Sequence, residues 1–164
     1  MLCRRQGSDL IDMRVYRVQA GDGRGPFRPG LSKHWCDYGH MPPATHKPIQ
    51  EEFGSDWLKE YKPGWMYGSA CLSLEQLATW FSKQERETLQ IMGYHPVALE
   101  PDAILRQGVA QLIIGCKNNF AQIAEKLSWN SLRANADVNP WRLFANTSHV
   151  PDVPDANTEV LVGW

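Results

Sequence analysis

The sequence has no excess of either charge. Its 17 Lys and Arg residues stand against 18 Asp and Glu residues, which gives a formal net charge of -1 at pH 7. Without a positive net charge, the chain has no general electrostatic attraction to nucleic acid or to an anionic membrane. Either kind of partner would therefore have to be recognised through a local site.

Long apolar runs and cysteine motifs are also missing. A membrane-spanning helix needs about 18 or more consecutive apolar residues, and the sequence has no such run. The segment "MLCRRQGSDLIDM" has basic residues but no apolar region of a secretory signal. The four cysteines form no CxxC pair, so we expect free thiols rather than disulfides at Cys3, Cys36, Cys71 and Cys116. Together these absences predict a cytoplasmic protein without a membrane partner.

The composition that remains is typical of a folded domain. The chain has 164 residues, of which 43% are hydrophobic and 21% are charged, enough to bury a core in one domain of ordinary size. We expect a flexible N-terminal extension over residues 1–12, an α+β domain over 13–115, and a C-terminal helical segment with a tail over 116–164.

The order of strand and helix signals favours the α+β class. β-Branched and aromatic residues are typical of strands, whereas glycine and proline clusters mark loops. In chain order we expect a strand in "MRVYRVQA", a glycine-rich loop over 21–30, an irregular loop over 31–50, a short helix from Ser55 or Asp56, a strand ending near Leu72, a helix or bent helical pair over 73–93, a strand in "YHPVALEP", and strands on both sides of Gly108. This order predicts a small mixed or antiparallel sheet with packed helices.

Residue spacing supports the helix that begins at Ser73 and predicts one further helix. Ser73 and Gln76 have the spacing of a capping box, in which the serine hydroxyl accepts from the Gln76 N–H and the Gln76 side chain accepts from the Ser73 N–H. Beyond residue 115, apolar side chains recur at helical spacing and predict one amphipathic helix, formed by Phe120, Ile123, Ala124 and Leu127. That helix would be the C-terminal helical appendage.

Several short segments also carry a family resemblance. The motifs "VYRV", "GRGPF", "SLEQLATWF", "GY" and "AQLIIG" occur in an order that resembles a family of small, mostly uncharacterised phage and bacterial proteins with a reduced ADP-ribosyltransferase-like core. The resemblance covers residues 13–115. It implies an ADP-ribosyltransferase-like α+β fold with NAD bound in a cleft.

The resemblance also implies particular site residues. In the transferase pattern an arginine on the first strand, a serine at a strand-to-helix junction and a glutamate on a later strand surround NAD. Arg17 occupies the first position and would bind phosphate, Ser73 occupies the second near the nicotinamide ribose, and Gln111 occupies the catalytic-strand position. The glycine-rich loop itself offers Arg24 and the backbone at Gly25 as further contacts to the phosphate. The alternative for this loop is a plain tight turn, because it is not a GxGxxG motif before a helix.

Gln111 departs from this pattern because a glutamate is expected there. A carboxylate near the ribose orients its hydroxyls and stabilises the positive charge of an oxocarbenium-like transition state. Glutamine supplies hydrogen bonds without the charge, so the resemblance implies NAD or ADP-ribose binding with altered or lost transfer to a protein or nucleic-acid acceptor. Glu75 and Glu100, the carboxylates nearest in sequence, are alternatives for the missing glutamate.

Other interpretations of the same residues remain open. Arg17 also fits an exposed strand position, and Ser73 also fits a cap without any further role. The loop over 31–50 holds donors that zinc accepts, at His34, Cys36, His40 and His46. Their spacing matches no known finger, so we expect no metal, and a zinc-stabilised binding module is a minor alternative. The alternative function is a non-enzymatic interaction protein that presents this loop and the tail to a host macromolecule.

Overall fold

Two antiparallel sheets organise residues 13–136, the part of the chain that this computed structural model describes. The first sheet contains, in order, β1 (Val15–Gln19), β3 (His95–Leu99) and β6 (Glu125–Lys126), and the second contains β2 (Met66–Ala70), β5 (Leu112–Cys116) and β4 (Ala103–Gln107). Tyr16 and Cys71 form a bridge that connects β1 to the end of β2 through hydrogen bonds of 2.8 and 2.7 Å. The expected α+β class is confirmed, with two small antiparallel sheets in place of one.

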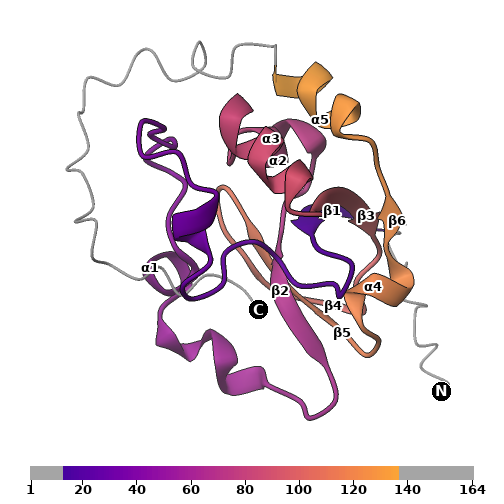
Figure 1. The fold of residues 1–164 in the computed structure, drawn as a ribbon. Helices are drawn as coiled ribbons and strands as arrows, with labels where there is room; N and C mark the ends of the chain where they lie inside the picture. Colours follow the sequence, from indigo (N-terminus) through magenta and orange to yellow (C-terminus); the bar gives the residue numbers. More distant parts are fainter. Residues whose placement is uncertain (1–12, 137–164) are drawn as a thin grey trace, which may run out of the picture.

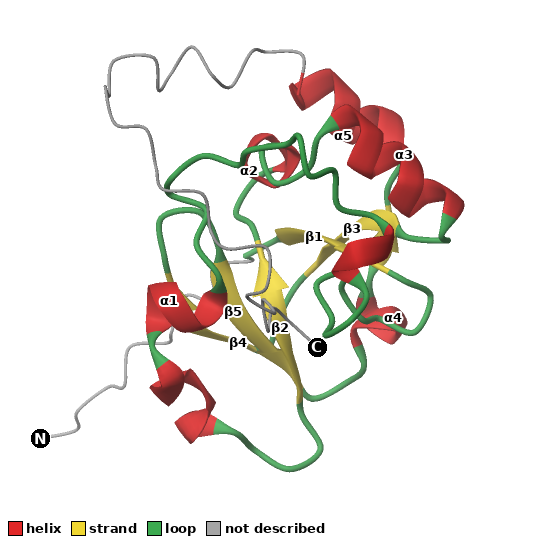
Figure 2. Cartoon of the chain, turned by 60° about the vertical axis from the view of Figure 1, so that its left-hand side comes forward, coloured by secondary structure: helices red, strands yellow, loops and turns green. Residues whose placement is uncertain are grey.

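Short helices surround the two sheets (Figure 1). They are α1 (Ile49–Phe53), α2 (Leu74–Ala78), α3 (Lys83–Ile91), α4 (Phe120–Ile123) and α5 (Trp129–Ala136), with 3₁₀ helices at η1 (Ser32–His34) and η2 (Ser55–Glu60). Helices α2, α3 and α5 lie together at one end of the molecule, whereas α1 lies beside the β5–β4 part of the second sheet (Figure 2). No helix in the described range has both the length and the hydropathy that crossing a bilayer requires.

Strand β5 is the most buried element, because it is paired on both edges and covered on both faces. Its side chains alternate between two apolar clusters, as a strand's period of two requires. Leu112 and Ile114 join a cluster with Phe120, whereas Ile113 points to the other face and packs with Ile49 and other residues near α1. A strand buried on both faces has a continuous apolar sequence, and this explains the run "LII".

The helix pair over 73–93 is confirmed, but one capping detail was wrong. The Ser73 hydroxyl accepts from the Gln76 N–H at 3.1 Å, as expected. The Gln76 side chain, however, accepts from the N–H of Leu72 at 2.8 Å rather than from that of Ser73. The reciprocal capping box lies one helix later, between Ser82 and Glu85 at the start of α3.

The segment before β2 contains a helix that the sequence did not indicate. Helix α1 begins after Pro48 and ends at Gly54, whose φ of 73° separates it from the next turn. The helix expected from Ser55 or Asp56 is the 3₁₀ helix η2. With only five residues, α1 is too short to show a helical period.

The single amphipathic helix expected over 120–127 was wrong. Helix α4 ends at Ile123, Ala124 is extended, and the next two residues pair with β3 as strand β6. The N–H of Leu127 then donates to Pro96 O at 2.9 Å. The free edge of β3 accounts for this difference, because unpaired backbone groups on a strand edge favour strand addition.

Residues beyond the expected boundary at 115 contribute to the same core. Strand β5 continues to Cys116, Phe120 is 0% exposed in the cluster around β5, and Leu132 of α5 is buried in the cluster around α2. Residues 1–12 and 137–164, including the expected N-terminal extension and the proline-rich tail, lie outside the described range.

Candidate functional site

A small pocket lies where β1, β2, the entry to β5, the glycine-rich loop and α2 meet. Its lining includes Arg17, Gly25, Phe27, Ser69, Trp80 and Gln111. The pocket has a volume of about 30 Å³. Because one water molecule needs roughly 10–15 Å³ on this scale, the pocket accommodates a small group rather than a whole dinucleotide.

Arg17 provides the positive charge of this pocket. The residue is 3% exposed, and neither its Nε nor its Nη1 has a hydrogen-bond partner. Burial lowers the pKa of Arg17 to about 10, so the guanidinium remains cationic at neutral pH. A buried charged donor without a partner is costly, and an anion in the pocket would offset that cost.

Phe120 and two glycines accommodate the Arg17 side chain. The guanidinium carbon lies 4.4 Å from the centroid of the Phe120 ring, a cation–π contact. A Cβ at Gly68 would collide with Arg17 Nη1, and a Cβ at Gly25 would lie 3.0 Å from its Nη2. Glycine at both positions therefore lets the guanidinium reach the pocket between β2 and the glycine-rich loop.

Gln111 provides a second polar group, at the entry to β5. It is 3% exposed. Its Nε2 donates to the backbone oxygen of Lys47 at 2.7 Å and to Glu52 Oε2 at 2.8 Å. Both protons of the amide are therefore in use, and its Oε1 remains as the group that can accept a hydrogen bond from a ligand.

Aromatic side chains form an apolar wall beside these polar groups. The Phe27 ring centroid lies 6.0 Å from that of Trp80 and 5.7 Å from that of Phe81. Trp35 Nε1 donates to Pro26 O at 3.0 Å, and Trp80 Nε1 donates to Ala110 O at 3.1 Å. The indoles thus hold both the glycine-rich loop and the residue before Gln111 in place.

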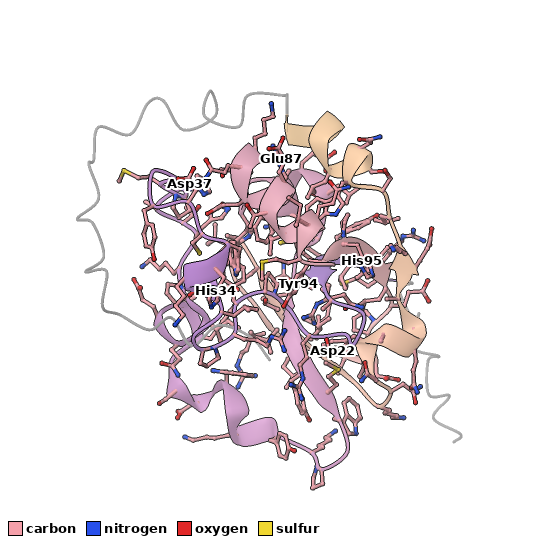
Figure 3. All side chains as sticks on the ribbon, in the orientation of Figure 1. Asp22, His34, Asp37, Glu87, Tyr94 and His95 are labelled. Carbon is pink, nitrogen blue, oxygen red and sulfur yellow. The ribbon has the colours of Figure 1, made fainter. Side chains whose placement is uncertain are left out.

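The glycine-rich loop is fixed from its other side by Arg28. The Nη2 of Arg28 donates to the Tyr94 hydroxyl at 2.7 Å, and its Nη1 lies 3.9 Å from Asp22 Oδ2. Figure 3 labels Asp22 and Tyr94, which lie near each other around the middle of the view. The loop that lines the pocket is therefore anchored to the residue that precedes β3.

The structure brings together some of the residues expected at a site and separates others. Arg17, Gly25 and Gln111 all line this pocket. Arg24 is exposed and lies outside the pocket lining, and Ser73 also lies outside it, with its hydroxyl on the N-cap of α2. The residue after Arg24, Gly25, is the one that lines the pocket, and the Ser73 hydroxyl caps α2 instead.

The serine in the pocket is Ser69, which was not predicted from the sequence. It lies within β2 and lines the pocket between buried Gly68 and Ala70. A polar residue inside the apolar strand "MYGSA" was the available signal. Neither Glu75 nor Glu100 lines the pocket, and both are exposed. The carboxylate beside Gln111 belongs to Glu52.

The loop over 31–50 packs against α2 and α3 and forms no metal site. Its His40 Nδ1 lies 2.8 Å from Glu85 Oε2, and the N–H of Asp37 donates to Glu85 Oε1 at 3.0 Å. Within residues 13–136, no three side chains of metal-ligand type come together. The potential zinc ligands of the loop are therefore not arranged as a zinc site.

His46 in this loop is held in a neutral form. The Thr79 hydroxyl donates to Gln76 O, so it accepts from His46 Nε2, while His46 Nδ1 accepts from the Thr45 hydroxyl. Burial, and then the neighbouring charge of His40, lower the pKa of His46 to about 4. A protonated ring would have no acceptor for its Nδ1 proton at Thr45 unless that hydroxyl rotated.

Acidification is expected to destabilise the protein through His46. An unfolded histidine has a pKa of about 6.5, so between about pH 6.5 and pH 4 the unfolded chain binds a proton that the folded chain does not. Stability therefore falls as the pH falls through this window. Urea unfolding of the wild type and of His46→Gln at several pH values measures it. We expect the stability advantage of the wild type to shrink toward pH 4, and a constant difference would contradict the assignment.

Comparison with known proteins identifies the family. Residues 13–129 match the family model of the Bacteriophage T4 Y00F protein. No curated protein and no solved structure matches the chain. The match begins at the expected domain start and extends beyond residue 115, through β6. The resemblance to small phage proteins is thus confirmed, whereas the ADP-ribosyltransferase-like core remains a prediction. The chain belongs to the Bacteriophage T4 Y00F protein family.

Proposed function

We propose that this protein binds a phosphorylated nucleotide, NAD or ADP-ribose, at the Arg17 pocket, through an ADP-ribosyltransferase-like arrangement. The observation that carries the proposal is the cationic guanidinium of Arg17, a residue that is 3% exposed, lines the pocket and has no hydrogen-bond partner at Nε or Nη1. Its planar fork of N–H donors suits the oxygens of a phosphate or pyrophosphate group. No such anion is supplied by the pocket's own side chains.

The other side chains that line the pocket favour a nucleotide over a simple anion. Gln111 presents an acceptor, which suits a ribose hydroxyl, and Phe27 and Trp80 present apolar surface, which suits the face of a sugar or a base. Arg17 on the first strand and Gln111 at a later strand are also the positions that the transferase resemblance assigns to phosphate and to the catalytic strand. Ser69 also lines the pocket.

The pocket volume limits how such a ligand is held. About 30 Å³ suffices for part of one phosphate group beside Arg17, so the remainder of a dinucleotide would lie outside the pocket. Because Gln111 carries no charge, binding is the primary proposal. Transfer of ADP-ribose to a protein or nucleic-acid acceptor is an extension of it, with reduced stabilisation of an oxocarbenium-like transition state.

Isothermal titration with NAD and with ADP-ribose tests the proposal. We expect the wild type to bind at least one of the two ligands, because each offers a pyrophosphate to Arg17. Arg24→Ala is a control variant, because Arg24 is an exposed arginine of the glycine-rich loop and lies outside the pocket lining. This variant should bind within about twofold of the wild type. Absence of binding at millimolar ligand would overturn the proposal and favour the non-enzymatic interaction protein.

A further inference from the structure

Glu52 on α1 forms an unusual set of contacts with the entry to β5. Its Oε2 accepts from Gln111 Nε2 at 2.8 Å, and its Oε1 accepts from the backbone N–H of Val109 at 2.8 Å. The two partners lie 59 and 57 residues away in the sequence. Figure 2 shows the corresponding arrangement, with α1 beside the β5–β4 part of the sheet. One carboxylate therefore binds both sides of the turn that precedes β5.

The backbone leaves space for this carboxylate. A Cβ at Gly108 would collide with Glu52 Oε1 and would lie 2.8 Å from Phe53 Cζ. Gly108 also donates its N–H to the backbone oxygen of Gln111 at 2.8 Å, which closes the turn between β4 and β5. The turn is thus compatible with glycine at this position and with a carboxylate packed directly against it.

The contacts fix which way the Gln111 amide faces. Its two neighbours on this side, the Lys47 backbone oxygen and the Glu52 carboxylate, are both acceptors. An inverted amide would set its Oε1 against two oxygens and would lose both hydrogen bonds. The amide nitrogen therefore faces Glu52, and the amide oxygen is the group left for the pocket.

We propose that Glu52 is a positioning residue that holds Gln111 as a hydrogen-bond acceptor, so that the pocket selects a phosphorylated ligand that also carries a free hydroxyl. This inference rests on the proposed nucleotide binding at Arg17 and adds the source of its selectivity. Arg17 binds the anionic group, and Gln111 Oε1 accepts from the hydroxyl. A bare phosphate or pyrophosphate makes only the first of these contacts.

The same geometry explains why glutamine stands at position 111. A glutamate there would place its carboxylate against the Glu52 carboxylate and the Lys47 backbone oxygen, with no donor between them. Like charges at this distance disfavour ionisation of both groups. The negative charge of this part of the molecule is therefore carried by α1, one hydrogen bond away from the pocket.

Glu52→Gln tests the inference with little change in shape. Its amide has an oxygen at only one of the two carboxylate positions, so it cannot replace both the bond from Val109 and the bond from Gln111, and the Gln111 amide is no longer fixed. We expect ADP-ribose affinity to fall about fivefold, the value of one hydrogen bond, while affinity for inorganic pyrophosphate stays within about twofold. Glu51→Gln is the matched control, because Glu51 is an exposed carboxylate of α1 that pairs with the Lys47 side chain. Both affinities should be unchanged in this control.

A second measurement does not depend on any ligand. Nitrogen-15 NMR of the Gln111 side-chain amide should show slow hydrogen exchange in the wild type and faster exchange in Glu52→Gln, while backbone amides of β5 keep their protection. If Glu52→Gln leaves the ratio of the two affinities unchanged, or lowers both equally, the positioning role is overturned although nucleotide binding stands. If the wild type binds neither ligand, the proposed function fails and this inference fails with it.

Discussion

Arg17→Met is expected to lower ADP-ribose affinity at least about 100-fold and, at the same time, to raise the free energy of unfolding by about 1 kcal/mol or more. Methionine retains apolar contact with Phe120 and removes a buried cation whose Nε and Nη1 have no partner. If Arg17 served only stability, Arg17→Met would lower the free energy of unfolding instead of raising it. Isothermal titration and urea unfolding of the same preparations measure the two effects.

Two controls make this result specific to the buried guanidinium. Arg24→Met makes the same chemical change at an exposed arginine outside the pocket lining, so affinity and stability should both stay near the wild-type values. Arg17→Lys keeps a charge without the planar fork and should lose affinity without gaining stability. Loss of stability in Arg17→Met with unchanged binding would show that Arg17 serves the fold rather than a ligand.

Phe120→Ala is expected to lower the free energy of unfolding by about 3–5 kcal/mol. Phe120 is 0% exposed, packs with Val15 and Val97, and supports the Arg17 guanidinium. Removing the ring leaves a cavity between the two sheets. Urea unfolding monitored by circular dichroism measures the loss.

The matched control for this variant is an exposed aromatic residue. Tyr38 is 79% exposed, so Tyr38→Ala should change stability by no more than about 0.5 kcal/mol. If Phe120→Ala were equally mild, residues from 116 onward would be an appendage, as the sequence pattern suggested. A large effect instead makes α4 part of the core on which the pocket is built.

Most strands and the central helix pair could be predicted from the sequence because their signals are local. The apolar period of "VYRV", the turn at Gly108 and the caps at Ser73 and Ser82 each act within a few residues. Strand β6 could not be predicted in this way. Its two residues become a strand only because the edge of β3, almost thirty positions earlier, is free to pair.

The residues of the candidate site also differ in whether the sequence indicated them. Arg17 and Gln111 were singled out by the family resemblance, and the structure puts both in one pocket. The groups that give them their chemistry had no local signal: Phe120 beneath the guanidinium and Glu52 against the amide. The resemblance assigned the serine position to Ser73, which caps α2. Ser69 could not be placed in the pocket from the sequence, because the face to which a strand residue points depends on pairing with β5.

The bridge between Tyr16 and Cys71 has a mechanical consequence for this pocket. Arg17 follows Tyr16 directly on the first sheet, whereas Ser69 and Gln111 belong to the second sheet and its entry. A ligand that contacts Arg17 and Gln111 together therefore spans two sheets whose backbones, within residues 13–136, are hydrogen-bonded to each other through Tyr16 and Cys71. A ligand bound in the pocket would form a further connection between the two sheets and would restrain the angle between them.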